Sequence, residues 1–285
     1  MQTAITMGKK VSSKELGLVA GLALGKFFFK TEDLHFGLWT DDLEPVVENF
    51  KVAQENYSRH LIDHIPTGVK TILDVGSGGG NLAAALLAEG YSVDCVSPSE
   101  HLSRRIEEKL GNQGELFKCK YEQLETGRRY DLILFSESFQ YVKIPAALRK
   151  CMELLNDEGH ILICDFFKLD SGRQSIQGGG HSLAKFQAHI EEAPVTKRLD
   201  IDITERTAPT IELWDAFLRD VGLPVRGLTV EYFRTRFPWI TRLLGWLLRQ
   251  RLARIDRDYF SGASLHQDFL ANKTYRLLLY QKTAA

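Results

Sequence analysis

The chain has 285 residues, of which 44% are hydrophobic, and its formal net charge at pH 7 is −1. This length suits one sizeable globular domain with a smaller lid or appendage, and the balanced charge argues against a nucleic-acid partner. Four widely spaced cysteines without a CxxC pair argue for free thiols in a reducing, cytoplasmic setting and against a metal site.

Residues 1–67 are predicted to form an N-terminal helical cap, because they contain no convincing strand. The apolar stretch 16–29 falls short of the roughly 20 residues that span a bilayer. We interpret it as a helix that covers the core, with contact to a membrane surface as the alternative. Lys14 and Glu15 break the run that follows Lys9 and Lys10, and no small-residue cleavage site of a secretory signal follows.

Residues 68–168 are predicted to form a cofactor-binding core, because short apolar runs alternate there with helical patterns. Strands alternating with helices imply right-handed βαβ units and a parallel sheet covered on both faces. The predicted strands lie at 71–75, 91–96, 114–120, 130–136 and 159–167, and the predicted helices at 81–90, 99–111 and 145–159.

Residues 169–285 are predicted to supply an acceptor-site lid, a helical insertion and the final strands. The stretch 274–282 reads as an antiparallel strand at the edge of the sheet. The stretch 236–255 reads as one helix, apolar almost all round between 239 and 248 and flanked by arginines. A helix of this composition must be covered. We expect it to pack on the sheet; a homodimer interface, a lipophilic acceptor tunnel and peripheral membrane contact are the alternatives.

A glycine-rich loop follows the first predicted strand, in the segment LDVGSGGGN from Leu73 to Asn81. The glycines have the spacing G-x-G-x-G, at Gly76, Gly78 and Gly80. A dinucleotide motif, G-x-G-x-x-G, would need glycine where Asn81 stands. The first strand-to-helix turn of an open α/β sheet lies at the edge where ligands bind. The loop therefore predicts a bound cofactor other than a dinucleotide, and Asp74 beside it suits one that carries an ammonium group.

The segment LDVGSGGG resembles motif I of the class I S-adenosylmethionine-dependent methyltransferases of the small-molecule type. YDLILFSESFQYV resembles the fourth strand of that family with its loop, and LLNDEGHILICDFF resembles its helix-glycine-fifth-strand motif. The resemblance implies an α/β fold with a Rossmann-like, mostly parallel seven-stranded sheet and S-adenosylmethionine as cofactor. It also implies methyl transfer to a small acceptor, and it assigns cofactor binding to Asp74 and the three glycines.

Two positions depart from the family pattern. Ser97 stands where many members have an acid that binds both ribose hydroxyls, and Lys120 fills the slot of an acid near the adenine. A serine hydroxyl can form one hydrogen bond with a ribose, whereas a carboxylate can form two charge-assisted ones. Further cofactor contacts are predicted at Trp39, Ser77, Ser97, Pro98, Ser99, Tyr121, Glu122, Ser136 and Glu137.

Three residues are candidates for catalysis. Glu137 lies in the loop after the fourth strand, where a carboxylate can attract a sulfonium or act as a base. His35 belongs to the aromatic segment LHFGLW (34–39), which we expect to close over the cofactor or acceptor. His181 follows three glycines in a lid candidate.

Methyl transfer needs little more than a positioned nucleophile, so the acceptor is hard to identify from sequence. The apolar insertion and the LHFGLW segment favour a hydrophobic metabolite or a lipid-like molecule. Whether oxygen, nitrogen, carbon or sulfur is methylated stays open. The alternatives are an NAD(P)-dependent oxidoreductase, disfavoured by Asn81, and a non-catalytic methyltransferase-like binding protein, suggested by Ser97 and Lys120.

Overall fold

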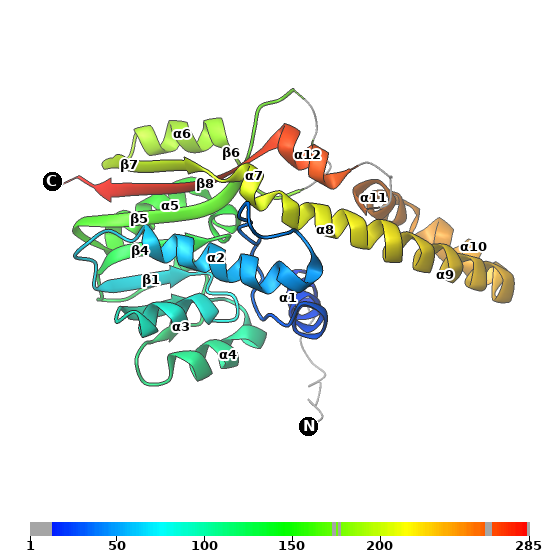
Figure 1. The fold of residues 1–285 in the computed structure, drawn as a ribbon, viewed down its shortest axis with the longest axis horizontal. Coiled ribbons are helices and arrows are strands. Elements are labelled where there is room, and N and C mark those ends of the chain that lie inside the picture. Colours follow the sequence, from blue (N-terminus) through cyan, green and yellow to red (C-terminus); the bar gives the residue numbers. More distant parts are fainter. Residues whose placement is uncertain (1–12, 173–174, 176–177, 260–263, 284–285) are drawn as a thin grey trace.

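The computed structural model describes residues 13–172, 175, 178–259 and 264–283, which are built around one twisted sheet (Figure 1). The strand order is β3-β2-β1-β4-β5-β8-β7, and β6 pairs with β5 off this path. Pairing is parallel from β3 to β5, whereas β8 runs antiparallel to β5 and β7. The strands are β1 (Thr71–Val75), β2 (Ser92–Val96), β3 (Leu116–Phe117), β4 (Tyr130–Ser136), β5 (Leu155–Lys168), β6 (His181–Ser182), β7 (Val195–Asp202) and β8 (Lys273–Lys282).

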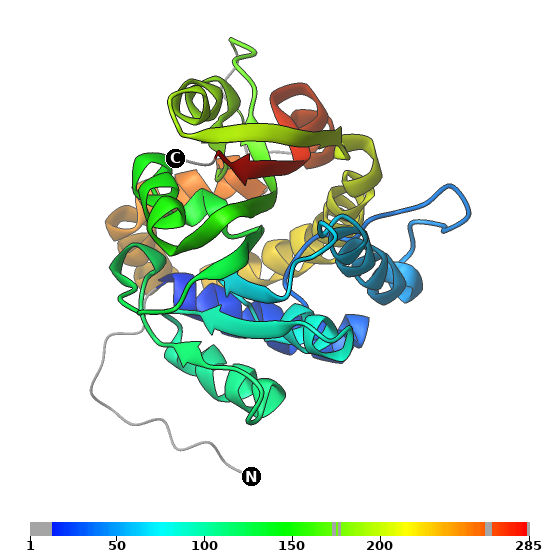
Figure 2. The ribbon, with the colours of Figure 1, turned by 90° about the vertical axis from the view of Figure 1, so that its left-hand side faces the viewer.

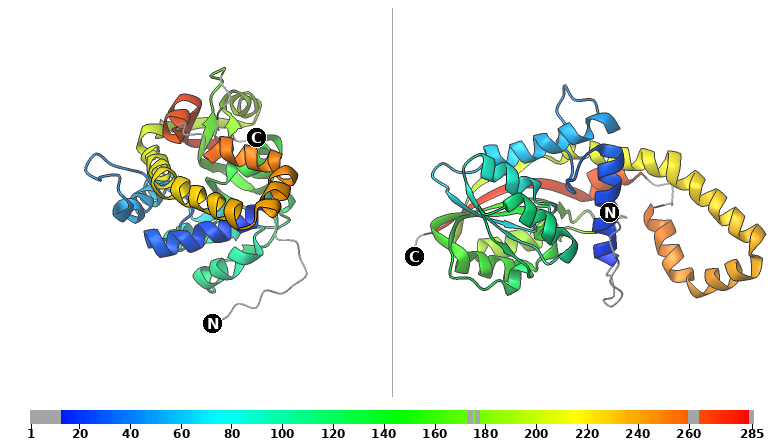
Figure 3. Two further views of the ribbon diagram at one scale, coloured as in Figure 1. Left: turned by 90° about the vertical axis from the view of Figure 1, so that its right-hand side faces the viewer. Right: turned by 90° about the horizontal axis from the view of Figure 1, so that it is seen from below.

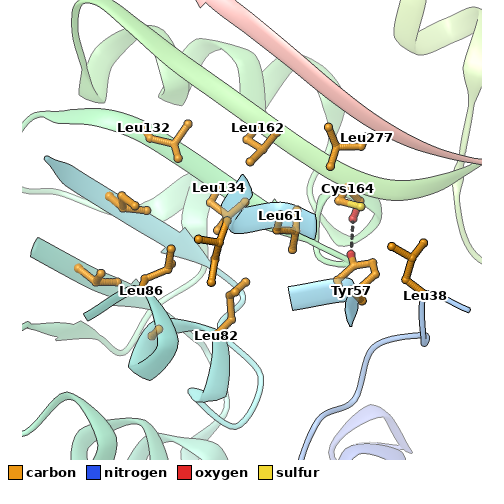
Figure 4. Packing of buried hydrophobic residues seen from close by; sticks show 14 of the residues in the cluster. Leu38, Tyr57, Leu61, Leu82, Leu86, Leu132, Leu134, Leu162, Cys164 and Leu277 are labelled. Carbon is orange, nitrogen blue, oxygen red and sulfur yellow. Dashed lines mark hydrogen bonds between the residues drawn. The ribbon is translucent and has the colours of Figure 1, made fainter. Parts of the chain in front are cut away.

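Helices cover both faces of the sheet (Figure 2). Successive side chains of a strand point to opposite faces, so Leu132 and Leu134 join one hydrophobic cluster while Ile133 and Phe135 join another. Figure 4 shows the first cluster, in which Leu61 and Tyr57 of a flanking helix pack on the sheet. The first face carries α2 (Phe50–Asp63), α3 (Asn81–Ala88) and α4 (Glu100–Leu110), and the second carries α5 (Ile144–Leu154) and α6 (Leu183–Glu191).

The described part of the N-terminal region is helical, as predicted, apart from residues 30–46 and 64–67. Leu22 is buried and Leu18 packs against the core, so the first helix covers the core as expected, although Phe27 and Phe28 are exposed. The elements of this region are α1 (Ser13–Leu24), the π-helical turn η1 (Gly25–Phe29) and the 3-10 turn η2 (Val47–Asn49); later 3-10 turns are η3 (Tyr121–Gln123) and η4 (Phe139–Tyr141).

The predicted Rossmann-like sheet is confirmed, with seven strands in its path and the two-residue β6 as an addition. The prediction that the last strand lies at the edge is wrong, because β8 lies between β5 and β7. Its residues Leu277, Leu278 and Leu279 are all buried, and such a continuous apolar run is typical of a strand covered on both faces. The edge belongs to β7, which the sequence did not reveal because charged residues dominate it.

Two predicted boundaries are wrong. The helix predicted at 145–159 ends at Leu154, because Leu155 already pairs with Tyr130 in the sheet and Glu158 has a φ of +59°. Asn156 and Asp157 also favour turns over helix. The third strand, predicted at 114–120, is only two residues long.

The insertion before the last strand is confirmed, but the single helix predicted at 236–255 is wrong. Phe237 adopts φ −135° and ψ 59°, as the residue before a proline tends to leave the helical region, and a second break falls at Leu248. The helices project from the body instead of packing on the sheet (Figure 3). The elements between β7 and β8 are α7 (Thr204–Thr207), α8 (Pro209–Phe217), the π-helical turn η5 (Leu218–Gly222), α9 (Leu223–Arg236), α10 (Pro238–Leu247), α11 (Arg249–Tyr259) and α12 (Leu265–Asn272). Of these, α8 and α12 belong to the body, since Ile211 and Phe269 lie in the first hydrophobic cluster.

Candidate functional site

The glycine loop connects β1 to α3 at the carboxyl edge of the sheet. Gly76, Gly78 and Gly80 have φ values of +78°, +52° and +82°, a region that only glycine enters at little cost. A Cβ at Gly76 would meet Ser138 Cβ at 2.5 Å, whereas a Cβ at Gly78 would meet no heavy atom within 4 Å. The loop thus packs on one side against the segment after β4 and is open on the other.

Asp74 and Ser138 leave polar atoms without partners beside this loop. Asp74 Oδ2 and Ser138 Oγ are buried and form no hydrogen bond with any residue that the structure describes. Burial raises the pKa of the Asp74 carboxyl to about 7. Buried polar groups are nearly always satisfied, so this cradle fits a ligand that brings donors, an ammonium group above all. Ser77 donates its hydroxyl hydrogen to the Asp74 carbonyl at 2.9 Å and so braces the loop.

Charged and polar side chains attach the N-terminal segment to the glycine loop and to α4. Asn81 Nδ2 donates to Asp33 Oδ1 at 2.7 Å, and Lys109 Nζ donates to the Gly79 carbonyl at 2.8 Å. Glu32 lies 3.4 Å from Arg105 and 3.7 Å from Lys109. Sequence reasoning missed Glu32, Asp33 and Lys109, since nothing near them in the chain links them to the loop.

Ser97, Pro98 and Ser99 follow β2 at the same edge. Ser97 Oγ is buried and accepts a hydrogen bond from Ser99 N at 3.3 Å. Ser99 Oγ accepts from Leu102 N at 3.3 Å, so Ser99 is the N-cap of α4. Asp94 points away from this edge, since it accepts hydrogen bonds from Glu115 N and Tyr130 OH.

Ser97→Ala is expected to weaken S-adenosylhomocysteine binding by less than about tenfold, the value of one neutral hydrogen bond. Titration calorimetry on the purified variant measures the change. A loss above a hundredfold would show that Ser97 has a larger part in binding than its single hydroxyl allows. The matched control is Ser103→Ala, which removes the hydroxyl of a buried serine on α4.

Glu137 occupies the position directly after β4. It has a φ of +50°, uncommon for a residue with a side chain, and its backbone N–H donates to the Cys164 carbonyl at 2.8 Å. Glu137 Oε1 accepts hydrogen bonds from Phe36 N at 2.6 Å and Tyr275 OH at 2.7 Å. Burial raises the pKa of Glu137 to about 8, against the lowering effect of both hydrogen bonds. A strained backbone that carries a partly buried carboxyl with a raised pKa is typical of functional sites.

A chain of hydroxyl groups continues from Glu137 into the sheet. Tyr275 OH, whose single hydrogen goes to Glu137, lies 3.1 Å from Tyr57 OH, and Tyr57 OH donates to the Cys164 carbonyl at 3.3 Å (Figure 4). Ser136 Oγ also reaches Tyr57 OH, at 3.3 Å. Sequence reasoning missed both tyrosines, which come from α2 and β8.

His35 stacks on Tyr57 with ring centroids 4.5 Å apart. Its Nδ1 lies 2.8 Å from the Phe36 carbonyl, which can only accept, so Nδ1 carries the proton. Burial lowers the pKa of His35, although Asp33 opposes this effect. The His35 ring therefore supports the Tyr57 side of the hydroxyl chain.

The remaining predicted residues lie around this centre. His181 Nε2 lies 2.8 Å from the Val142 carbonyl and holds the turn after β4. Trp39 Nε1 donates to Thr210 Oγ1 at 3.0 Å and ties the N-terminal segment to α8. Tyr121 turns its ring into the core, with its hydroxyl 3.3 Å from Cys151 Sγ, while its neighbour Glu122 is partly exposed on η3.

A second buried polar group lies at the carboxyl end of β5. Asp165 accepts hydrogen bonds from Gln140 N at 3.0 Å and Phe166 N at 2.8 Å, and burial raises its pKa to about 7. Lys273 is buried at the start of β8, where its ammonium group donates to the Gly179 carbonyl at 2.8 Å. These contacts attach the glycine-rich segment at 178–180 to the sheet edge.

Comparison with known proteins gives the arrangement a context. A family model described as a methyltransferase domain matches residues 49–197. An uncharacterized methyltransferase from Staphylococcus carnosus (strain TM300) is 28% identical over 153 residues, which are 50% of this chain and 71% of that protein. A ubiquinone biosynthesis O-methyltransferase from Nitrosomonas europaea is 33% identical over 110 residues, which are 36% of this chain and 47% of that protein.

Among solved structures, the fold is similar to that of a geranyl diphosphate C-methyltransferase from Streptomyces coelicolor A3(2), in complex with Mg²⁺, geranyl diphosphate and S-adenosyl-L-homocysteine. The TM-score is 0.65 at 13% identity, over 97% of this chain and 100% of that one. At this identity the likeness concerns the fold alone.

Proposed function

The chain belongs to the methyltransferase domain family, and from this premise we propose that it moves a methyl group to a small hydrophobic metabolite or lipid-like acceptor. It is an S-adenosylmethionine-dependent methyltransferase with a class I, Rossmann-like fold. An NAD(P)-dependent oxidoreductase and a non-catalytic binding protein are thereby set aside. The kind of acceptor and the roles of individual residues make up the proposal.

The cofactor residues of the proposal surround the glycine loop. Bound S-adenosylmethionine supplies an electrophilic methyl group on a sulfonium. Gly76, Gly78 and Gly80 allow the backbone to lie close to it, and the unpartnered oxygen of Asp74 is placed to accept from its ammonium group. Ser97 at the end of β2 is placed for one ribose hydroxyl.

An apolar pocket carries the proposal of a hydrophobic acceptor. It has a volume of about 110 Å³ and lies where η1, η2, α2 and α8 meet. Among the described residues of its wall, Thr210 alone has a side-chain hydroxyl, and that oxygen already accepts from Gly37 N and Trp39 Nε1. The lining residues are Phe28, Phe29, Val47, Phe50, Thr210, Leu213, Trp214 and Phe217.

The pocket and Glu137 share one connecting segment. Gly37 N donates a hydrogen bond to Thr210 Oγ1 in the pocket wall, and the preceding Phe36 N donates to Glu137 Oε1. An apolar group in the pocket gains roughly 0.8 kcal/mol for each buried methylene. This arrangement supports an acceptor with an apolar part in the pocket and its nucleophilic atom near Glu137.

Glu137 is the proposed general base. In its ionised form it takes the proton of an acceptor hydroxyl or amine as that atom attacks. Tyr275 and Phe36 N hold the carboxyl in one position, and Tyr57 in turn holds Tyr275. A thiolate acceptor would need no base, so the pH profile of turnover bears on the nature of the nucleophile.

The proposal is tested with a labelled methyl donor on an organic-solvent extract and an aqueous extract of the same cells. Labelled product is expected from the organic extract. Trp214→Ala, which opens the pocket, should lower this turnover by roughly tenfold or more and leave S-adenosylhomocysteine binding unchanged. Leu270→Ala on α12 is the control, because its exposed fraction of 41% matches the 42% of Trp214. Product confined to the aqueous extract would contradict a hydrophobic acceptor.

A further inference from the structure

The helices η5, α9, α10 and α11 (residues 218–259) extend away from the body of the protein, and we call them the arm. Figures 1 and 3 show α9 continuing the line of α8 away from the sheet, α10 turning at the far end, and α11 returning. None of the residues in η5, α9 and α10 is buried. Among the side chains that the structure describes, none from the arm belongs to either hydrophobic cluster. Packing inside the protein therefore does not account for the many apolar residues of the arm.

Large apolar side chains recur along the arm at helical spacing and are exposed. Val221, Val225, Leu228 and Tyr232 recur at intervals of four, three and four residues, so they share one face. All four are exposed, Leu228 by 69%. Such a stripe on a surface helix normally faces a core or a partner.

The tip of the arm repeats the pattern with tryptophans. Trp239, Leu243 and Trp246 on α10 are also spaced by four and three residues, and the two indole rings are 69% and 65% exposed. Tryptophan is enriched at the boundary between lipid headgroups and acyl chains, because its ring is apolar and its N–H polar. The tip therefore has the side chains of an interfacial helix.

The charge of the arm sets it apart from the body. Residues 218–259 contain nine arginines and four acidic residues, a net charge of +5 in a chain whose total is −1. Arg219 and Arg226 have acidic partners, at 3.1 Å and 2.5 Å. Five others form no ion pair with any residue that the structure describes: Arg234, Arg236, Arg242, Arg249 and Arg251.

We propose that the arm docks on the surface of an anionic lipid bilayer, with its apolar side chains in the headgroup boundary and its arginines on the phosphates. Each basic residue near an anionic membrane adds to the attraction, and apolar burial adds the rest. A symmetric pair of arms would place two surfaces of charge +5 against each other, which argues against a second copy of the chain as the partner.

The helices of the arm lie along the membrane surface in this proposal. No described helix is long and apolar enough to cross a bilayer. The α10 helix has 10 residues, about half of what the hydrocarbon core needs. The inference does not depend on the nature of the acceptor.

Flotation of the full-length protein with vesicles tests the proposal. It is expected to float with vesicles of phosphatidylcholine and phosphatidylglycerol at low salt, to float far less with phosphatidylcholine alone, and to be released by high salt. The double variants Arg234→Glu/Arg236→Glu and Trp239→Ser/Trp246→Ser should each lower the partition coefficient at least about tenfold.

A matched control separates the arm from total charge. Arg104→Glu/Arg149→Glu makes the same charge change on α4 and α5, where both arginines form exposed ion pairs, and should float like the parent. Titration with S-adenosylhomocysteine shows whether each variant is folded. The proposal is overturned if the protein ignores anionic vesicles, if it binds neutral ones equally, or if either arm variant floats like the parent. A dimer in light scattering without vesicle binding would also overturn it, in favour of a second copy.

Discussion

Gly78→Val is expected to abolish S-adenosylhomocysteine binding, with a loss of affinity of at least about a hundredfold. The open side of the glycine loop is the reason. A Cβ at Gly78 would meet no heavy atom of the protein within 4 Å. The valine side chain would therefore project into the space that the cofactor needs in order to approach the loop backbone. Titration calorimetry measures the affinity, and a thermal melt with and without the ligand gives a second readout.

The control for this variant is Gly90→Val. Gly90 follows α3, has a φ of +92° and is likewise free of neighbours within 4 Å. The substitution therefore introduces the same kind of backbone strain away from the loop. If Gly78→Val and Gly90→Val bind the ligand equally well, the glycine loop is not where the cofactor lies.

Glu137→Gln is expected to lower turnover by about 10²- to 10⁴-fold, the usual contribution of a general base, while leaving S-adenosylhomocysteine affinity within a few-fold of the parent. The amide keeps the shape of the side chain and can still accept from Phe36 N and Tyr275 OH, so the site should stay assembled. Single-turnover assays on the extract fraction that yields labelled product measure the chemical step.

The pH profile gives an independent check on Glu137. Its pKa is about 8, and only the ionised carboxylate accepts a proton. Turnover should therefore rise about tenfold per pH unit below pH 8 and level off above it. Tyr275→Phe removes a hydrogen bond that lowers this pKa, so the inflection should move to higher pH. A profile that is flat through pH 8, with an active Gln variant, would exclude Glu137 as the base.

The parts that sequence predicts best are those encoded locally. The run TILDV followed by glycines specifies β1 and the loop within ten residues, and Ser99 specifies the start of α4. Apolar strands alternating with helices were enough to predict the parallel half of the sheet. The family resemblance extended this to the cofactor.

The parts that sequence did not reveal depend on contacts between distant segments. Phe36 N and Tyr275 OH bind the same Glu137 oxygen across 101 and 138 residues. Nothing local marks either residue, because a backbone N–H has no sequence signal and a tyrosine in a strand usually packs in the core. The direction of the arm could not be predicted for a related reason. An apolar helix must be covered, but its own sequence does not identify the element or partner that covers it.

The position of β8 in the sheet has a consequence for the order of folding. The ribosome makes β8 after β5 and β7, yet β7 reaches the sheet only through β8. Until residues 273–282 emerge, β5 has an open edge, β7 has no strand to pair with, and Tyr275 is absent from Glu137. Unpaired edges recruit other chains, so the nascent protein passes through a stage prone to aggregation. A chain truncated before Lys273 would lack β8 and the pairing of β7, and the sheet edge that carries Glu137 would remain unfinished.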